Sequence, residues 1–269
     1  MDVEIGDPAG TRYRTLAARS HYLASALLLL AVLGVWELAS RNGLVHQIIL
    51  PAPTDIFAAM RDLFTSTFLF PHVWTTLYET LVGFVIASVV AFVVAVLLSN
   101  FAFARGVFYP YIVTFQVLPK VALAPIFITW LGFGLSSKIF LAATISFFPV
   151  LVNTLAGFES VSESSSALMR SLVASRWQIF SRLSLPWSLP YVFAGLKTSL
   201  TLALIGAIVA EFEGAERGLA VLIKSFSYQF KMPQVFAVLF VLGALGLLLY
   251  GLMEYLERRI VYWNRVDSS

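Results

Sequence analysis

Thr80–Ala104 reads TLVGFVIASVVAFVVAVLLSNFAFA and contains no charged residue. A helix of about 20 mostly apolar residues crosses a bilayer core that is about 30 Å thick. This stretch therefore predicts a membrane-spanning helix. Comparable apolar runs predict four further spans, at Tyr22–Ser40, Ile139–Phe158, Tyr191–Ala210 and Met232–Met253.

Gly106–Ser137 is also nearly free of charge, with Lys120 as its one ionised residue. It is too long for a single straight span, and it contains Pro110, Pro119 and Pro125. Because proline removes a helix hydrogen bond and bends the chain, we expect one broken helix here. The sequence thus predicts an all-α, polytopic membrane protein with about six transmembrane helices.

The composition agrees with a lipid environment. The 269 residues are 59% hydrophobic and 12% charged, whereas about 25% of the residues of a soluble domain are charged. This excludes a disordered chain and argues against a soluble enzyme. Since the chain has no cysteine and three scattered histidines, we expect no disulfide, no metal site and no histidine-based catalytic centre. A net charge of +3 gives no reason to expect nucleic acid as a partner.

The distribution of Lys and Arg predicts the orientation. If the N-terminus is inside, the inner segments hold ten of these residues and the outer segments hold six, with Lys138 among the outer ones. The positive-inside rule then places both termini in the cytoplasm. On the outer side, Asp55–Phe64 has apolar residues at helical spacing, which predicts a short amphipathic helix with Thr54 as its N-cap.

The inner loop Glu159–Pro190 is the longest polar stretch between spans. Its apolar spacing predicts two short helices, Glu159–Leu172 and Ser175–Ser184, and we expect Pro186 to end the second one. Either these helices pack on the chain's own bundle, or they form a docking surface for a cytoplasmic partner. The spacing alone leaves both readings open.

This loop is similar to a loop of ABC importer permeases. The resemblance rests on Arg170–Phe180 (RSLVASRWQIF) and Leu183–Pro186 (LSLP), and it points to the nitrate/sulfonate/taurine/bicarbonate permease family, which includes thiamine-precursor and riboflavin importers. Further segments match in the same order, so that the resemblance covers roughly residues 44–263: Leu50–Pro53, Pro119–Pro125, Trp130–Gly134, Phe148–Pro149 and Val209–Glu211.

The resemblance implies a domain organisation around a type I ABC importer permease core. Residues 1–20 would be a cytoplasmic tail, and residues 21–73 the first span with the outer amphipathic segment. Residues 74–257 would form the ABC transmembrane type-1 domain with its coupling loop at 159–190, and residues 258–269 a second cytoplasmic tail.

The resemblance also implies partners. Two permease copies would assemble with two ATP-binding-cassette ATPases and a periplasmic or lipid-anchored solute-binding protein, surrounded by lipid in a prokaryotic inner membrane. The chain has no G-x-x-x-x-G-K-[ST] loop, so ATP and Mg would be used by the partner ATPase, and this chain would be neither an enzyme nor bound to a cofactor. The residues that would couple to the ATPase are Ala167, Leu168, Met169, Arg170, Leu172, Val173, Ser175, Arg176, Trp177, Ile179, Leu183, Leu185 and Pro186.

This loop departs from the family pattern at two places. Ala167, Leu168 and Met169 stand where the family has Glu-Ala-Ala, and Val173 stands where it has glycine. A β-branched residue resists the positive φ that glycine adopts easily. Three explanations follow: the turn is an ordinary helical one, the contact with the ATPase is weaker, or a second, different permease supplies the intact loop of a heterodimer.

Polar residues within the spans are candidates for the translocation path, because burying them in lipid is costly. We expect Glu37 and Glu79 to reach the membrane interface. The path candidates, each of which has a structural role as its alternative, are Gln116, Lys120, Thr129, Asn153 and Glu211.

The solute is left open by these residues. A nitrate-, sulfonate- or taurine-like anion and a thiamine precursor, riboflavin or another aromatic compound are all compatible with the resemblance. The alternative function is a stand-alone secondary transporter or channel, against which stands the absence of an internal sequence repeat.

Overall fold

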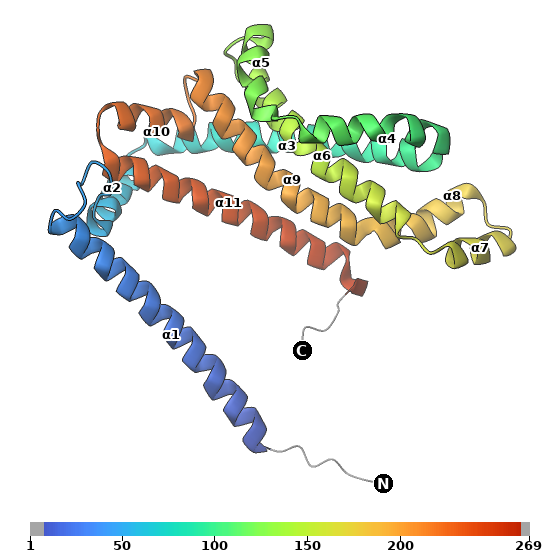
Figure 1. The fold of residues 1–269 in the computed structure, drawn as a ribbon, viewed down its shortest axis with the longest axis horizontal. Coiled ribbons are helices and arrows are strands. Elements are labelled where there is room, and N and C mark those ends of the chain that lie inside the picture. Colours follow the sequence, from blue (N-terminus) through green and yellow to red (C-terminus); the bar gives the residue numbers. More distant parts are fainter. Residues whose placement is uncertain (1–7, 265–269) are drawn as a thin grey trace. The chain divides into compact units, whose positions relative to one another are not determined.

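The computed structural model describes residues 8–264, and within that range the chain is helical and contains no strand. Figure 1 shows the order of the helices along the chain. Their bounds are α1 Pro8–Arg41, α2 Pro53–Thr65, α3 Leu69–Asn100, α4 Ala102–Val117, α5 Ala124–Leu131, α6 Leu135–Glu159, α7 Glu163–Ser171, α8 Arg176–Ile179, α9 Leu185–Gly214, α10 Leu219–Tyr228 and α11 Met232–Ile260.

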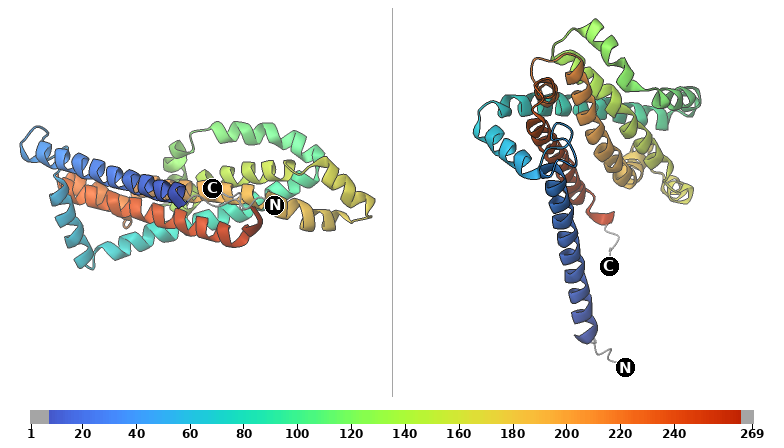
Figure 2. Two further views of the ribbon diagram at one scale, coloured as in Figure 1. Left: turned by 90° about the horizontal axis from the view of Figure 1, so that it is seen from below. Right: turned by 60° about the vertical axis from the view of Figure 1, so that its left-hand side comes forward.

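Five helical segments among the described residues are long and apolar enough to cross a membrane, and α4 with α5 makes a sixth if the bent pair is one span. These two helices meet at an angle of 84°, and the bend is visible in both views of Figure 2. Leu118 is extended before Pro119, as the ring of a following proline requires. The prediction of six spans with a broken third one is therefore confirmed.

The helices are longer than the apolar runs predicted. The second span begins at Leu69 instead of Thr80, because the hydroxyl groups of Thr76 and Thr80 donate to backbone carbonyls one turn earlier, at 3.2 and 2.7 Å. Polar residues whose groups are bonded within the helix do not end it. At the N-terminus, residues 8–20 of the predicted tail are helical and continuous with the first span; residues 1–7 and 265–269 of the two predicted tails lie outside the described residues.

The chain forms two compact units. The first consists of the described part of Met1–Thr65 together with Phe226–Ala237, and the second of Ser66–Ser225 with the described part of Val238–Ser269. Within the first unit, one Glu37 carboxylate oxygen accepts the backbone N–H of Thr54 at 3.1 Å and the other accepts the Thr54 hydroxyl at 2.7 Å. Arg41 joins the same network through Glu37 and Asp55. Glu37 of α1 thus holds the start of α2.

The N-cap predicted for this helix is wrong. The helix begins at Pro53, so Thr54 lies inside its first turn. Proline suits the first helical position because its missing N–H would have no partner there. The next free N–H, that of Thr54, is bound by a carboxylate of another helix.

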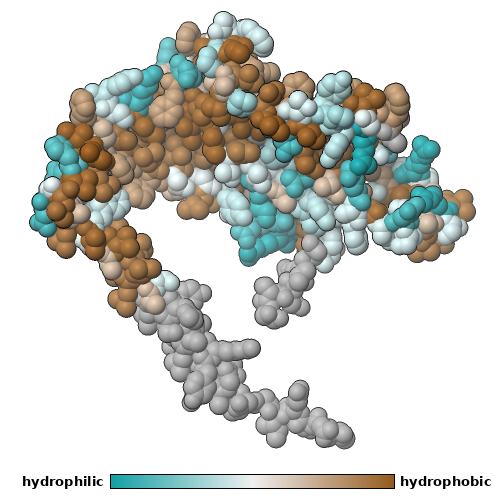
Figure 3. Space-filling model, in the orientation of Figure 1, coloured by the Kyte–Doolittle hydropathy of each residue, from teal (hydrophilic) through white to brown (hydrophobic). Residues whose placement is uncertain are grey.

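The centre of the second unit is the packing of α3, α6 and α9, which approach closely at small residues. A Cβ atom on Gly206 of α9 would lie 2.8 Å from the Cα of Ala142 in α6, and one on Gly195 would lie 2.8 Å from the carbonyl oxygen of Pro149. Small residues allow such close contact between helices in lipid. The core of this unit is therefore a rigid helical layer whose outer surface is apolar, as the brown side chains over the long helices in Figure 3 show.

Candidate functional site

The loop between α6 and α9 carries two short helices, as predicted, but their bounds differ. The helix expected over Glu159–Leu172 is split, because α6 extends to Glu159 and α7 begins at Glu163. Ser162 caps α7 by accepting the N–H of Ser165 at 3.2 Å. Ser175 and Gln178 form a reciprocal capping box at the start of α8, which confirms the predicted start of the second helix.

The prediction that Pro186 ends the second helix is wrong. Phe180–Ser184 forms a π-helical turn in which the N–H of Leu185 donates to the carbonyl of Phe180, five residues earlier. The wider turn gives the Pro186 ring room where an α-helical carbonyl would clash with it. As a result, Arg176–Gly214 is one continuous helical segment of 39 residues, and α8 extends α9 without a loop.

Val173 adopts the left-handed conformation, with φ of 58°. The N–H groups of Val173 and Ala174 donate to the carbonyls of Arg170 and Met169 at 2.9 and 3.0 Å, which is the pattern of a Schellman cap. The explanation that this turn is an ordinary helical one is therefore wrong. Val173 adopts the left-handed backbone conformation that is usually occupied by glycine, and this conformation costs a non-glycine residue about 1–2 kcal/mol.

Several large apolar side chains are exposed on α7, on α8 and in the turn between them. Leu172 and Trp177 are 69% and 71% exposed, and Leu168 is exposed with them. Met169 and Ile179 are half-buried, and Arg170 and Arg176 lie exposed beside them. Figure 3 shows apolar and polar side chains next to one another over these helices. Of the other predicted coupling residues, Ala167 and Ser175 are exposed, whereas Leu183, Leu185 and Pro186 are half-buried at the start of α9.

Lys120 lies at the break between α4 and α5. Its ammonium group donates to the carbonyl of Gln116 at 2.8 Å and lies 4.6 Å from the centre of the Phe148 ring. The side chain is half-exposed. The Gln116 and Thr129 side chains are exposed on the same broken span.

The other two path candidates lie elsewhere. The Asn153 amide donates to the carbonyl of Pro149 within α6, and its Cβ faces Gly195 of α9. Glu211 is buried on α9. The structure therefore brings Lys120 and Gln116 together but does not gather the five candidates into one site.

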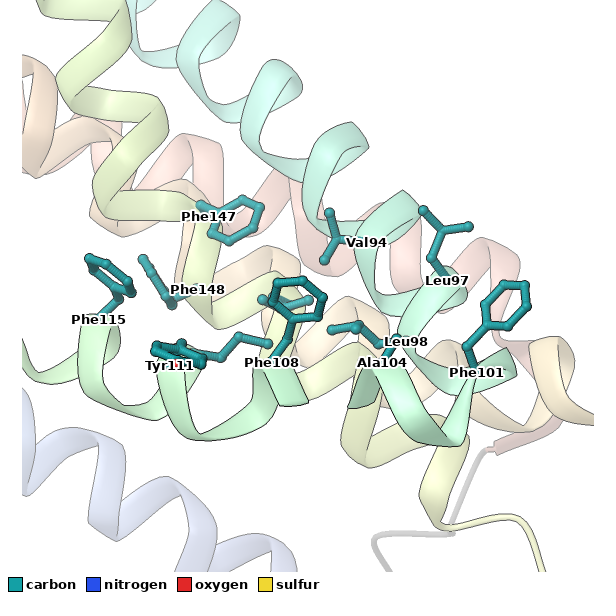
Figure 4. Close-up of a pocket in the computed structure, with 12 residues that line it drawn as sticks. Val94, Leu97, Leu98, Phe101, Ala104, Phe108, Tyr111, Phe115, Phe147 and Phe148 are labelled. Carbon is teal, nitrogen blue, oxygen red and sulfur yellow. The ribbon is translucent and has the colours of Figure 1, made fainter. Parts of the chain in front are cut away.

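An apolar cavity of about 550 Å³ lies between the end of α3, α4 and α6. Figure 4 shows aromatic rings on both sides of it, among them Phe108, Tyr111 and Phe147. Phe148 also lines this cavity, so Lys120 lies behind one of its walls. The walls offer planar rings and almost no hydrogen-bonding group, which suits an apolar or aromatic guest.

A buried polar cluster lies in the second unit where α3, α6 and α9 meet the start of α10. It contains Glu79, which is 0% exposed, Glu211, which is 1% exposed, and Lys138, which is also buried. The expectation that Glu79 reaches the interface is wrong, because α9 and α6 cover it. Sequence reasoning assigned Lys138 to an outer segment and missed it. The available signal for a buried polar cluster was the spacing of Thr76, Glu79 and Thr80, which places these three polar residues on one face of a helix.

Among the residues with described side chains, no group of three His, Cys, Asp or Glu residues is placed to hold a metal ion.

The chain is similar to known transport permeases. A family model described as binding-protein-dependent transport system inner membrane component matches residues 83–262. The formylaminopyrimidine transport permease protein ThiX of Halalkalibacterium halodurans is 34% identical over 244 residues, which cover 90% of this chain and 96% of that protein. The riboflavin transport system permease protein RibX of Chloroflexus aurantiacus is 32% identical, over 90% of each chain.

More distant similarity extends to other solutes and to a solved structure. The taurine transport system permease protein TauC of Escherichia coli is 27% identical over 88% of each chain. A chain of the MetNI methionine ABC transporter in an inward-facing conformation matches with a TM-score of 0.64 at 20% identity, over 72% of this chain and 96% of that chain. At this identity the match shows a shared fold.

Proposed function

We propose that the α7–α8 segment of this chain receives the motion of an ATP-binding-cassette ATPase. The chain belongs to the family of binding-protein-dependent transport system inner membrane components and is the permease subunit of an ABC importer. Membership of this family rules against the alternative function of a stand-alone secondary transporter or channel. A transport permease is not an enzyme, and in this proposal ATP and Mg are used by the partner, with no cofactor bound by this chain.

The observation that carries the proposal is the exposed apolar surface of α7 and α8. Burying a leucine or tryptophan side chain is worth about 1.5–3 kcal/mol, and Leu168, Leu172 and Trp177 are left outside the core of their unit. Exposed apolar residues with a polar rim are typical of protein interfaces. Arg170 and Arg176 would form that rim. This favours docking over packing on the chain's own bundle.

The continuous segment from α8 through α9 supports the transmission step. A push on Trp177 would reach the membrane-spanning part of α9 through hydrogen-bonded helix, since no loop intervenes between Arg176 and Gly214. Packed helices are bistable and transmit displacements instead of absorbing them. In this proposal the ATPase therefore moves α9 directly.

The rest of the assembly follows the family in this proposal. Two permease copies, two ATPases and a periplasmic or lipid-anchored solute-binding protein would form the importer in a prokaryotic inner membrane. Val173 keeps a glycine-like cap at the turn, so the altered loop retains the shape of a docking segment. This supports a homodimer in which the strained turn at Val173 contacts the ATPase. A second, different permease is then not needed to supply an intact loop.

For the solute, we propose a heteroaromatic compound. Two of the more similar relatives are named for the transport of formylaminopyrimidine and of riboflavin. Lys120, Gln116 and Thr129 would line the path at the broken span. An unpaired lysine within a membrane helix costs about 2.5–3.5 kcal/mol, and the half-exposed Lys120 has only a carbonyl and an aromatic ring as described partners. Water in the path would offset that cost.

The docking proposal is tested with Leu172→Asp. Removing a buried leucine contact and adding a charge is expected to weaken ATPase binding by about tenfold to a hundredfold. The measurement is the amount of ATPase that co-purifies with the tagged permease in detergent. Ser164→Asp places the same charge on an exposed polar position of α7 and serves as the control. If Leu172→Asp retains the ATPase as well as Ser164→Asp does, the docking surface lies elsewhere.

A further inference from the structure

The start of α10 is held by three consecutive backbone N–H groups. Gly218 donates to Nδ1 of His72 at 3.0 Å, Leu219 donates to the hydroxyl of Thr76 at 2.9 Å, and Ala220 donates to a Glu211 carboxyl oxygen at 2.7 Å. These groups of a helix N-terminus have no partner within the helix. We call this arrangement the α10 latch: residues 218–220 bound by α3 and α9.

Glu211 is the most constrained acceptor of the latch. Its second carboxyl oxygen accepts the hydroxyl of Thr76 at 2.5 Å. Gly218 packs so closely on it that a Cβ atom there would lie 2.2 Å from the carboxyl carbon. The position of this carboxyl group therefore determines whether the N–H group of Ala220 and the hydroxyl of Thr76 keep their acceptor.

Glu79 lies against this carboxyl group and has no donor. Glu79 lies one helical turn from Thr76 on α3, and the hydroxyl of Thr76 donates to Glu211, so the two carboxyl groups lie near each other. Among the described residues, no N–H or O–H group of another side chain or of the backbone donates to either oxygen of Glu79. Two carboxyl groups can share a hydrogen bond only when one of them carries a proton.

The charged groups around Glu79 and Glu211 also indicate that the two carboxyl groups hold one proton. The ammonium group of Lys138, on α6, donates to the carbonyls of Phe133, Gly134 and Gly214 and so has no proton left for Glu79. It still supplies one positive charge nearby. On α3, Nδ1 of His72 contacts both the N–H and the carbonyl oxygen of Gly218. The first turn of α10 contains no titratable residue, and Lys224 of its second turn is exposed and donates to the carbonyl of Phe212.

Glu216 and Arg217 are the remaining charged groups on this side. Both are exposed and of opposite charge, and they line a cavity of about 490 Å³ that Glu79 and Lys138 also line. Two buried carboxylates against one buried ammonium would leave one uncompensated negative charge, which is expensive to bury. A single proton removes that charge and supplies the missing hydrogen bond.

We infer that Glu79 and Glu211 form a proton-binding site that holds one shared proton while the α10 latch is closed, and that losing this proton opens the latch. Deprotonation would place two like charges in contact. Glu211 would then move away from Glu79, and the N–H group of Ala220 and the hydroxyl of Thr76 would lose their acceptor. This inference concerns the chain alone and does not depend on docking of an ATPase.

The proton itself is measured by infrared spectroscopy of the full chain in detergent. A protonated carboxyl group has a carbonyl band that a carboxylate lacks. We expect this band in the wild type at neutral pH, its loss in Glu79→Gln, and its retention in Glu213→Gln, which removes an exposed carboxylate of α9, the helix that carries Glu211. A wild-type spectrum without the band, or a band that survives in Glu79→Gln, would overturn the inference. The wild-type spectrum decides the question even if Glu79→Gln does not fold.

Opening of the latch is measured with a single cysteine, since the chain has none. Ala220→Cys lies buried at the latch, and Tyr228→Cys is exposed at the far end of α10 and corrects for the pH dependence of the thiol itself. Between about pH 6 and pH 9, the corrected labelling rate at residue 220 should rise by about tenfold or more. In a Glu79→Gln background, whose amide mimics the protonated acid, the rise should vanish. An unchanged rise in that background would contradict the inference.

Discussion

The α7–α8 segment and the buried cluster around Glu79 depart from ordinary packing in opposite ways. In α7 and α8, apolar side chains such as Leu172 and Trp177 lie outside the core. Around Glu79, charged side chains lie inside it, and most of their hydrogen bonds stay within the same unit. The first departure indicates a missing partner, whereas the second indicates a site that is complete in the chain except for a proton. Substitutions should therefore affect assembly in the first region and stability in the second.

The largest effect is expected for Gly218→Ala. The new methyl group would overlap the Glu211 carboxyl, and φ of 138° is unfavourable for alanine. Overpacking and backbone strain each cost about 1–3 kcal/mol, so the thermal unfolding temperature of the chain in detergent should fall strongly. Gly243→Ala, where a methyl group meets no neighbour within 4 Å, is the control. Equal unfolding temperatures for the two variants would mean that the latch is not tightly packed.

Lys120 lies between the two extremes, since it is polar, within a span and half-exposed. Lys120→Met keeps most of the aliphatic chain and removes the charge. If the ammonium group lines the solute path, assembly and basal ATP hydrolysis should be normal while transport in proteoliposomes falls about tenfold or more, which corresponds to about 1.4 kcal/mol or more. Transport at the wild-type rate would exclude this role, and a lower unfolding temperature would indicate a structural one.

The smallest effect is expected for Val173→Gly. Glycine adopts the left-handed conformation without the penalty that valine carries. Because glycine also gains entropy in the unfolded chain, we expect a net gain of at most about 1 kcal/mol in local stability. Hydrogen exchange of the Val173 and Ala174 amides should slow by a few fold in the variant. Unchanged exchange would show that the Schellman cap does not depend on this residue, and faster exchange would show that valine stabilises it.

Structural features that depend on residues close together in the sequence could be predicted from the sequence. Runs without charge located the spans, and Pro119 located the break in the third one. The pair Ser175 and Gln178 likewise carries the start of α8 in its own side chains. The continuity of α8 with α9 was missed, because proline ends an α-helix but is tolerated after a π-helical turn, and no local pattern distinguishes the two outcomes.

Properties that depend on distant residues could not be predicted. Glu79 is buried by α6 and α9, which lie far along the chain from α3, and the carbonyl of Gly214 binds Lys138 only once α6 and α9 have packed. The left-handed turn at Val173 is also imposed from outside the residue, since its own side chain disfavours it. In each case the tertiary arrangement overrides the local preference.

The central claim is that α8 moves with α9 when the ATPase moves. Spin labels on cysteines at Gln178 and Thr198, both exposed, would be about 30 Å apart along one helix. In the assembled importer, that distance should be the same with and without ATP, while the distance between the two Gln178 positions of the permease pair should change. A change in the 178–198 distance on ATP binding would show that the π-helical turn is a hinge and would contradict the account.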